Sequence, residues 1–156
     1  VTGLCNRSFA EQWLTKQTTY VRRAGEPLTL LILGLEDFGQ VDDQYGKSYA
    51  DRALQEFAGR LKKASRGCDL AVRMGADEFL IALPGCGVGA AKKVLDRLGP
   101  VEINCDGTSL TLAYSAAWID YQPGESAGDL LARADQMLQL YKKASRESAS
   151  APVVAH

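Results

Sequence analysis

The sequence contains a single histidine, His156, and four widely spaced cysteines. Because that histidine is the last residue, catalysis by a histidine acid–base pair or by a serine–histidine–aspartate triad is excluded. Any bound metal ion must then be held by oxygen ligands. No two cysteines form a C-x-x-C pair, so neither a zinc site nor a disulfide framework is indicated. We expect free thiols in a reducing cytoplasm.

The sequence also lacks a long apolar run and an excess of charge of either sign. It has 18 Lys and Arg against 19 Asp and Glu, a net charge of −1. No basic field is present to attract nucleic acid or an anionic membrane. No segment approaches the ~20 apolar residues of a membrane span, and no signal peptide is recognised. We therefore expect a cytoplasmic domain with no nucleic-acid partner and no membrane contact, and we interpret Val1-Thr2-Gly3 as the start of a fragment.

Apolar spacing and turn residues predict a mixed order of helices and strands. Helices are expected at residues 6–24, 50–61, 90–98 and 130–141, and strands at 28–35, 69–74, 79–83, 101–104 and 109–119. A polar segment without assigned structure separates the first strand from the second helix. This order favours an α+β fold, with a mostly antiparallel central sheet that carries helices. Residues 1–146 are expected to form one domain, and residues 147–156 a frayed tail or a linker to a following domain.

Gly46-Lys47-Ser48 has the appearance of the end of a phosphate-binding P-loop. The motif G-x-x-x-x-G-K-[ST] requires a glycine five residues before Gly46, and that position holds Val41. Without the first glycine the loop cannot cradle phosphates with its backbone amides. We reject a P-loop on this ground.

Two adjacent carboxylates, Asp77 and Glu78, follow Gly75 in the predicted hairpin. Alternation along a strand places their side chains on opposite sides of the turn's exit. They are either solvated turn residues or part of a carboxylate cluster that holds Mg²⁺ for phosphoryl chemistry. A magnesium cluster needs a further carboxylate from a neighbouring strand, and residues 30–36 are the obvious donor.

Five motifs in order make the chain resemble the GGDEF family of diguanylate cyclases. They are Thr2-Gly3-Leu4 with Asn6-Arg7; Phe38, Val41, Asp43, Tyr45 and Gly46; Asp51 with Leu54; Arg73-Met74-Gly75-Ala76-Asp77-Glu78-Phe79; and Ala134-Asp135 with Lys142 and Arg146. Each motif is weak alone, but together they cover nearly the whole chain at the family's spacing. The chain is therefore identified as a member, and the resemblance implies the family's nucleotide-cyclase, palm-like fold.

The resemblance implies that two GTP molecules are condensed into cyclic di-GMP between two facing domains, with Mg²⁺ at the α-phosphate. By the same resemblance, Asp77 is a metal ligand, Glu78 is the neighbouring active-site carboxylate, and the Leu35 carbonyl is a backbone metal ligand. Asp42 and Asp51 are expected to contact guanine, and the backbone near Phe38 to bind phosphate. The remaining nucleotide-binding residues implied are Gly75, Ala76, Lys142 and Arg146.

Several positions depart from the family pattern. The first aspartate of the family's D-x-D, a metal ligand in active members, is Gly34, and the family lysine after phenylalanine is Gly39. The family asparagine is Asp42, which accepts hydrogen bonds but cannot donate one when ionised. The second signature glycine is Ala76, whose methyl group can crowd the ligand. Glu36 shares the strand face of Gly34 and is the candidate to replace the lost metal ligand.

A second set of residues resembles the product-binding inhibitory site of some family members. Arg66 and Asp69 match the R-x-x-D pattern before the hairpin, and Arg97 stands where such members carry a second arginine. Two guanidinium groups and a carboxylate suit the phosphates and guanine of cyclic di-GMP. The alternative is a surface pair between Arg66 and Asp69 that contributes little.

These observations leave two main functions open. In the first, the domain is impaired in catalysis and acts as a regulatory module that binds GTP or cyclic di-GMP. It would form a homodimer through the full-length protein and lie next to another signalling domain, such as an EAL phosphodiesterase. In the second, it is a working diguanylate cyclase that uses Mg²⁺ in an altered metal site. A purely structural dimerisation spacer is the third possibility.

Overall fold

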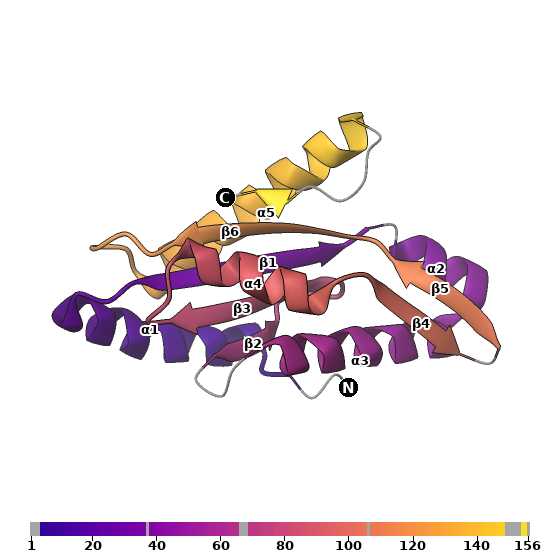
Figure 1. The fold of residues 1–156 in the computed structure, drawn as a ribbon, viewed down its shortest axis with the longest axis horizontal. Helices are drawn as coiled ribbons and strands as arrows, with labels where there is room; N and C mark the ends of the chain where they lie inside the picture. Colours follow the sequence, from indigo (N-terminus) through magenta and orange to yellow (C-terminus); the bar gives the residue numbers. More distant parts are fainter. Residues whose placement is uncertain (1–3, 37, 66–68, 106, 149–153, 156) are drawn as a thin grey trace.

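The structure, a computed structural model, describes residues 4–36, 38–65, 69–105, 107–148 and 154–155. The helices of these residues are α1 (Arg7–Ala24), α2 (Phe38–Tyr45), α3 (Lys47–Ala64), α4 (Val88–Leu98) and α5 (Ala127–Ser148). The strands are β1 (Leu28–Leu35), β2 (Leu70–Arg73), β3 (Glu78–Pro84), β4 (Val101–Cys105), β5 (Thr108–Leu112), β6 (Tyr114–Asp120) and β7 (Val154–Ala155). Figure 1 shows their arrangement.

A five-stranded sheet in the order β2-β3-β1-β6-β7 forms the centre of the molecule. The pairs among β2, β3, β1 and β6 are antiparallel, and β7 pairs with β6 in parallel. All eight residues of β1 are buried, as expected for an unalternating apolar run at the centre of a covered sheet. The predicted α+β fold is confirmed.

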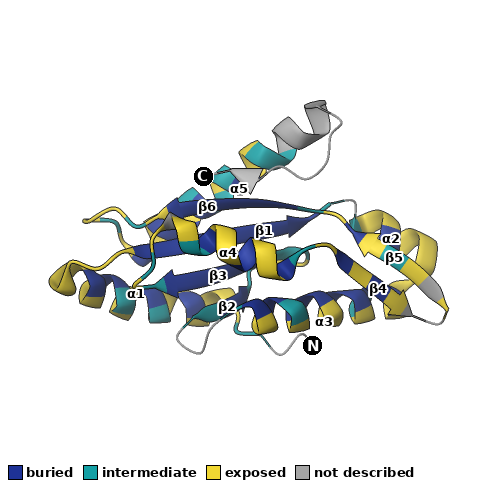
Figure 2. Ribbon diagram, viewed as in Figure 1, coloured by how far each residue is buried: buried dark blue, intermediate teal, exposed yellow. Residues whose placement is uncertain are grey.

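Helices cover both faces of this sheet (Figure 1). On one face, α3, α4 and the separate β4–β5 hairpin enclose a core around Phe57 and Phe79, whose rings lie 5.1 Å apart. On the other face, α1 and α5 enclose a second core that includes Leu14, Leu80 and Leu138. Figure 2 shows β1, β3 and β6 mostly buried and the helices exposed on their outer sides. The two cores hold the sheet rigidly between them, and the site described below lies at one end of it.

Short segments from outside the helices pair with both edges of the sheet. Before α1, Cys5 forms a parallel bridge with Val72 of β2, and its carbonyl accepts a hydrogen bond of 2.9 Å from the Arg73 amide. After α5, β7 pairs with β6. The side chain of Asn6 then caps α1 by accepting from the Phe9 amide at 2.9 Å.

The structure differs from the sequence predictions in three elements. The polar segment after β1 contains the helix α2, in which Val41 is the single buried residue, so its sequence carries almost no apolar period. The strand expected at 109–119 is two strands, β5 and β6, which belong to different sheets. The chain changes sheets at Ala113, whose carbonyl accepts a hydrogen bond of 2.8 Å from the Glu36 amide. The C-terminal helix continues to Ser148, past the expected start of the tail.

Candidate functional site

The β2–β3 turn lies beside the end of β1 and brings the two signature carboxylates there. The Leu35 amide donates to the Asp77 carbonyl at 3.0 Å, and Gly34 is the strand partner of Glu78. The Asp77 side chain faces a cavity between the turn, α2 and α3. The Glu78 side chain is on the opposite side and accepts a hydrogen bond of 3.0 Å from Gln139 of α5. The side chains of Asp77 and Glu78 therefore lie on opposite sides of the turn.

The cavity on the α2–α3 side has a volume of about 340 Å³. Its lining residues are Phe38, Gly39, Asp42, Lys47, Ala50, Asp51, Leu54, Arg73, Ala76 and Asp77. Four of them were predicted from the sequence to bind the nucleotide, namely Phe38, Asp42, Asp51 and Ala76, and Asp77 was predicted as a metal ligand. Gly75 lies in the turn itself and is exposed. The structure thus gathers most of the predicted nucleotide-binding residues into one hollow.

Arg73 and Lys47 line the same cavity and were not predicted as site residues. Arg73 donates from Nε to the Gly75 carbonyl at 3.1 Å and from Nη2 to the Ala76 carbonyl at 2.8 Å. These bonds fix the turn that carries Asp77. The signal for Arg73 was its place at the head of the signature motif, whereas Lys47 was visible only as part of the rejected P-loop.

Glu78 is half-buried between β3 and α5. Burial raises the pKa of its carboxyl, the Lys142 ammonium group lowers it, and the carboxylates of Asp135 and Asp77 raise it again. The net result is a raised pKa. Asp135 is itself paired with Arg7 at 2.8 Å. Three carboxylates, those of Asp77, Glu78 and Asp135, therefore lie beside the middle of α5, together with the cations of Arg7 and Lys142.

Lys142 lies directly over Gly34. A Cβ atom placed on Gly34 would overlap Cε of Lys142 and would lie 2.8 Å from its Nζ and 3.1 Å from Cδ2 of Leu138. The space in which the family resemblance implies a metal-binding carboxylate is therefore filled here by the end of a lysine side chain. An aspartate at this position would fit only if the lysine swung away.

Glu36, the candidate replacement ligand, is engaged elsewhere. Its carboxylate accepts a hydrogen bond from the hydroxyl of Ser115, a fully buried residue of β6 that pairs with Gly34. Within the described ranges, no three acidic, cysteine or histidine side chains gather closely enough to hold a metal ion. The described residues do not fit the family's magnesium site, because its first carboxylate is missing and a cation occupies its place.

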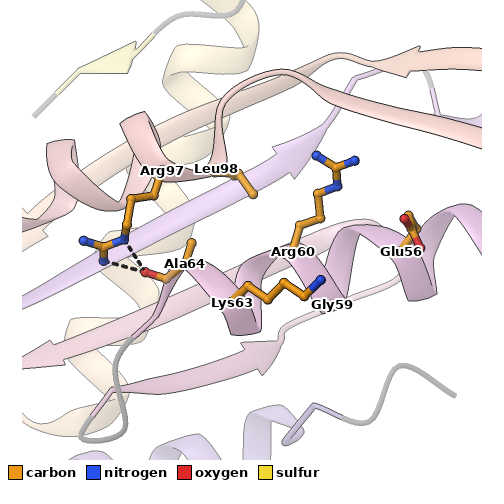
Figure 3. A pocket seen from close by; sticks show the side chains of 7 residues that line it. All are labelled: Glu56, Gly59, Arg60, Lys63, Ala64, Arg97 and Leu98. Atoms are coloured by element: carbon orange, nitrogen blue, oxygen red, sulfur yellow. Dashed lines mark hydrogen bonds between the residues drawn. The ribbon is translucent and has the colours of Figure 1, made fainter.

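The proposed inhibitory site is described only in part. Arg66 lies outside the described residues, and Asp69 is half-buried just before β2. Arg97, in the last turn of α4, donates from Nε to the Ala64 carbonyl at 3.0 Å and so caps the C-terminus of α3 (Figure 3). Beside it, Arg60 and Lys63 of α3 help to line a cavity of about 500 Å³. For Arg146, only the backbone, within α5, is described.

Comparison with known proteins agrees with this geometry. Residues 1–148 match the family described as diguanylate cyclase, GGDEF domain. The diguanylate cyclase DgcP of Pseudomonas aeruginosa is 30% identical over 151 residues, which are 94% of this chain and 22% of DgcP. The chain spans between 22% and 43% of the length of the first three curated relatives that it matches.

Solved structures show the same fold. The diguanylate cyclase SiaD of Pseudomonas aeruginosa, crystallised with its activator SiaC, superposes with a TM-score of 0.85 at 29% identity, over 92% of this chain and 56% of SiaD. The GGDEF domain of DgcB from Caulobacter crescentus, in complex with c-di-GMP, gives a TM-score of 0.84 at 21% identity, over 99% of this chain and 90% of the other.

The fold, the signature turn and the match over residues 1–148 together define a nucleotide-cyclase type of domain, and the chain belongs to the GGDEF family of cyclic di-GMP signalling domains. Its signature reads Gly75-Ala76-Asp77-Glu78-Phe79. No helix in the described part of the chain is long and apolar enough to span a membrane.

Proposed function

We propose that this domain is a catalytically impaired member of its family that acts as a regulatory module and binds GTP or cyclic di-GMP. The observation that carries the proposal is the replacement of a metal-binding aspartate by Gly34, together with the Lys142 side chain that fills the vacated space. Loss even of residues that only support metal ligands lowers activity or metal affinity about 10–100-fold. A missing ligand has at least that effect.

Nucleotide binding is proposed because the other half of the site is retained. Asp42 and Asp51, the residues expected at guanine, line one cavity together with Asp77. The carboxylates of Asp42 and Asp51 can accept hydrogen bonds from N1–H and from the N2 amino group of guanine. The turn next to them is fixed by Arg73. We further propose that Arg66, Asp69 and Arg97 bind cyclic di-GMP, and that the full-length protein is a homodimer with a neighbouring signalling domain such as EAL.

The test of impaired catalysis is a product assay. The protein is incubated with GTP and Mg²⁺, and cyclic di-GMP is measured by chromatography. Glu78→Ala, which lacks the active-site carboxylate, is the negative control. We expect the two proteins to give the same trace amount of product. Turnover by the unmodified protein that Glu78→Ala abolishes would instead establish a working cyclase, the function that the retained pair Asp77 and Glu78 favours.

The test of binding is calorimetry with GTP and, separately, with cyclic di-GMP. We expect heat from at least one of the two ligands. Arg66→Ala is expected to weaken cyclic di-GMP binding without changing GTP binding, since its proposed partners Asp69 and Arg97 are not among the residues that line the cavity of Asp42 and Asp51. The absence of heat with both ligands would contradict the proposal of a regulatory nucleotide-binding module. A purely structural dimerisation spacer would then be the remaining function.

A further inference from the structure

The side chain of Lys142 is half-buried, and its end has a defined position. It rests over Gly34 on β1, and the backbone of β1 at that point has no side chain to keep it away. Leu138, one turn earlier in α5, packs against the same spot with Cδ2. Gly34 thus stands where the family pattern has an aspartate, and the end of Lys142 occupies the space of the missing side chain.

The surroundings of this ammonium group are acidic. Glu78, the strand partner of Gly34, is attracted by Lys142 and repelled by Asp135 and Asp77. The other cations nearby have their donors in use: Arg7 pairs with Asp135, and Arg73 donates to two carbonyls of the turn. A polyanionic ligand that approached this end of the sheet would be repelled by these carboxylates and attracted by Arg7, Arg73 and Lys142, of which Lys142 lies over Gly34.

The family resemblance implies a divalent metal at this end of the sheet, with a carboxylate ligand at the position of Gly34. We propose that in this protein the Lys142 ammonium group replaces the cation at this position, so that a nucleoside triphosphate binds the domain without a divalent metal. This inference rests on the proposed function, since it concerns the phosphate end of the same nucleotide. A lysine ammonium is a compact charge with three donors and is a common phosphate ligand.

A purely steric role for Lys142 is the competing explanation. Its methylene groups could simply fill the hole left by the missing aspartate side chain, and the charge would then be incidental. Lys142→Met separates the two explanations, because methionine keeps an unbranched apolar side chain and removes the ammonium group. Lys92→Met is the matched control, since it removes one exposed lysine from α4 on the other face of the sheet.

The experiment measures the affinity for GTP by calorimetry in EDTA and again in excess Mg²⁺. We expect the unmodified protein and Lys92→Met to bind GTP in both buffers, with dissociation constants within about threefold of each other. In EDTA, Lys142→Met is expected to bind at least 10-fold more weakly, the size of effect that loss of one charged hydrogen-bond donor produces. Circular dichroism of each variant checks that the fold is retained.

Gly34→Asp provides a second, independent variant. The new carboxylate displaces the flexible end of Lys142 and neutralises it, so GTP binding in EDTA is expected to fall about 10-fold and to return when Mg²⁺ is added. This result would show that the lysine and the metal fill the same role. Equal binding by Gly34→Asp and the unmodified protein in EDTA contradicts the inference.

The outcomes of these binding experiments separate this inference from the proposed function. If GTP binds only when Mg²⁺ is present, or if Lys142→Met binds GTP in EDTA as well as the unmodified protein, the inference is wrong and the nucleotide-binding module stands. If cyclic di-GMP binds and GTP does not, the inference again fails alone. If neither ligand binds in either buffer, both fail.

Discussion

On the α2–α3 side of the β2–β3 turn, Asp42, Asp51 and Asp77 line one cavity, whereas on the α5 side the space beside Glu78 holds the end of Lys142. We propose that Asp42 and Asp51 on the first side accept hydrogen bonds from a guanine base. On the second side a lysine side chain fills the space over Gly34, the position at which the family resemblance implies a metal-binding aspartate. Under our proposal, the domain keeps nucleotide recognition on the first side and loses catalysis through the change on the second.

The largest expected effect tests the side that is retained. Asp51→Asn keeps the shape of the side chain but replaces one acceptor by a donor, which would oppose the donors of guanine N1 and N2. We expect the affinity for GTP to fall about 10–100-fold, because a buried donor would lose its partner. Calorimetry in EDTA and in Mg²⁺ should give the same loss.

Asp43→Asn is the control for that variant. Asp43 is exposed on α2, is next to Asp42 in sequence, and is not among the residues that line the cavity. It should bind GTP like the unmodified protein. An equal loss in both variants would mean that overall negative charge, rather than recognition of the base, governs binding, and the contrast between the two sides of the turn would disappear.

A smaller effect is expected where α5 begins. Glu125 accepts hydrogen bonds from Nε and Nη2 of Arg133 at 2.9 and 2.8 Å and from the Gln122 amide at 2.9 Å. The bond from Arg133 lowers the pKa of Glu125 below its usual value, and burial opposes it. Glu125→Gln should lower the free energy of unfolding at neutral pH by about 1 kcal/mol.

The pH dependence of this effect has a definite sign. Because the folded pKa of Glu125 is depressed, its stabilising contribution is present above the usual value of 4.5 and is lost as the pH falls through the folded pKa. Urea unfolding from pH 7 down to pH 3 should therefore show the two proteins converge at the acidic end. A difference that is constant with pH would show that the charge of Glu125 is not responsible.

The smallest effect is expected at Glu78, and its sign is opposite. Its folded pKa is raised, so its contribution to stability is fully present below 4.5 and is lost as the pH rises through the folded pKa. Glu78→Gln, which has no charge to bury, should stabilise the protein at neutral pH by less than about 1 kcal/mol. The advantage should shrink as the pH falls toward 4.5 in the same urea series.

The outcome at Glu78 bears directly on the contrast between the two sides. If Glu78→Gln destabilises the protein at neutral pH, the attraction between Glu78 and Lys142 outweighs the cost of burial. The lysine would then be held in place by Glu78 and would be less available to a ligand. Together, the Glu125 and Glu78 variants show whether α5 is held to the sheet mainly at its first turns or at the site.

The sequence predicted the parts of this structure that leave a local signature. The run at 28–35 became β1 residue for residue, and the hairpin with Asp77 and Glu78 formed where the glycine and the flanking apolar runs placed it. The loss of a side chain at Gly34 was also visible in the sequence. These features depend on the period of apolar residues and on turn chemistry, which a sequence records directly.

The parts that were missed depend on tertiary packing. α2 has a single buried residue, Val41, and therefore shows no helical pattern of apolar residues. The change of sheets at Ala113 has no glycine or proline to mark it, and it is fixed by the contact with the Glu36 amide. The position of Lys142 follows from the packing of α5 on β1, so the sequence alone could name the lysine but not place it over Gly34.

The two edges of the central sheet have a further consequence for the behaviour of the protein in solution. An unpaired edge strand is a template on which another molecule can add its own strand. Here the chain ahead of α1 joins β2 through Cys5, and the chain beyond α5 joins β6 through β7. Among the described residues these pairings reach Val72 of β2 and Ala116 and Ala117 of β6, so they cover part of each edge. We expect that shortening either segment exposes more of an edge strand and increases self-association.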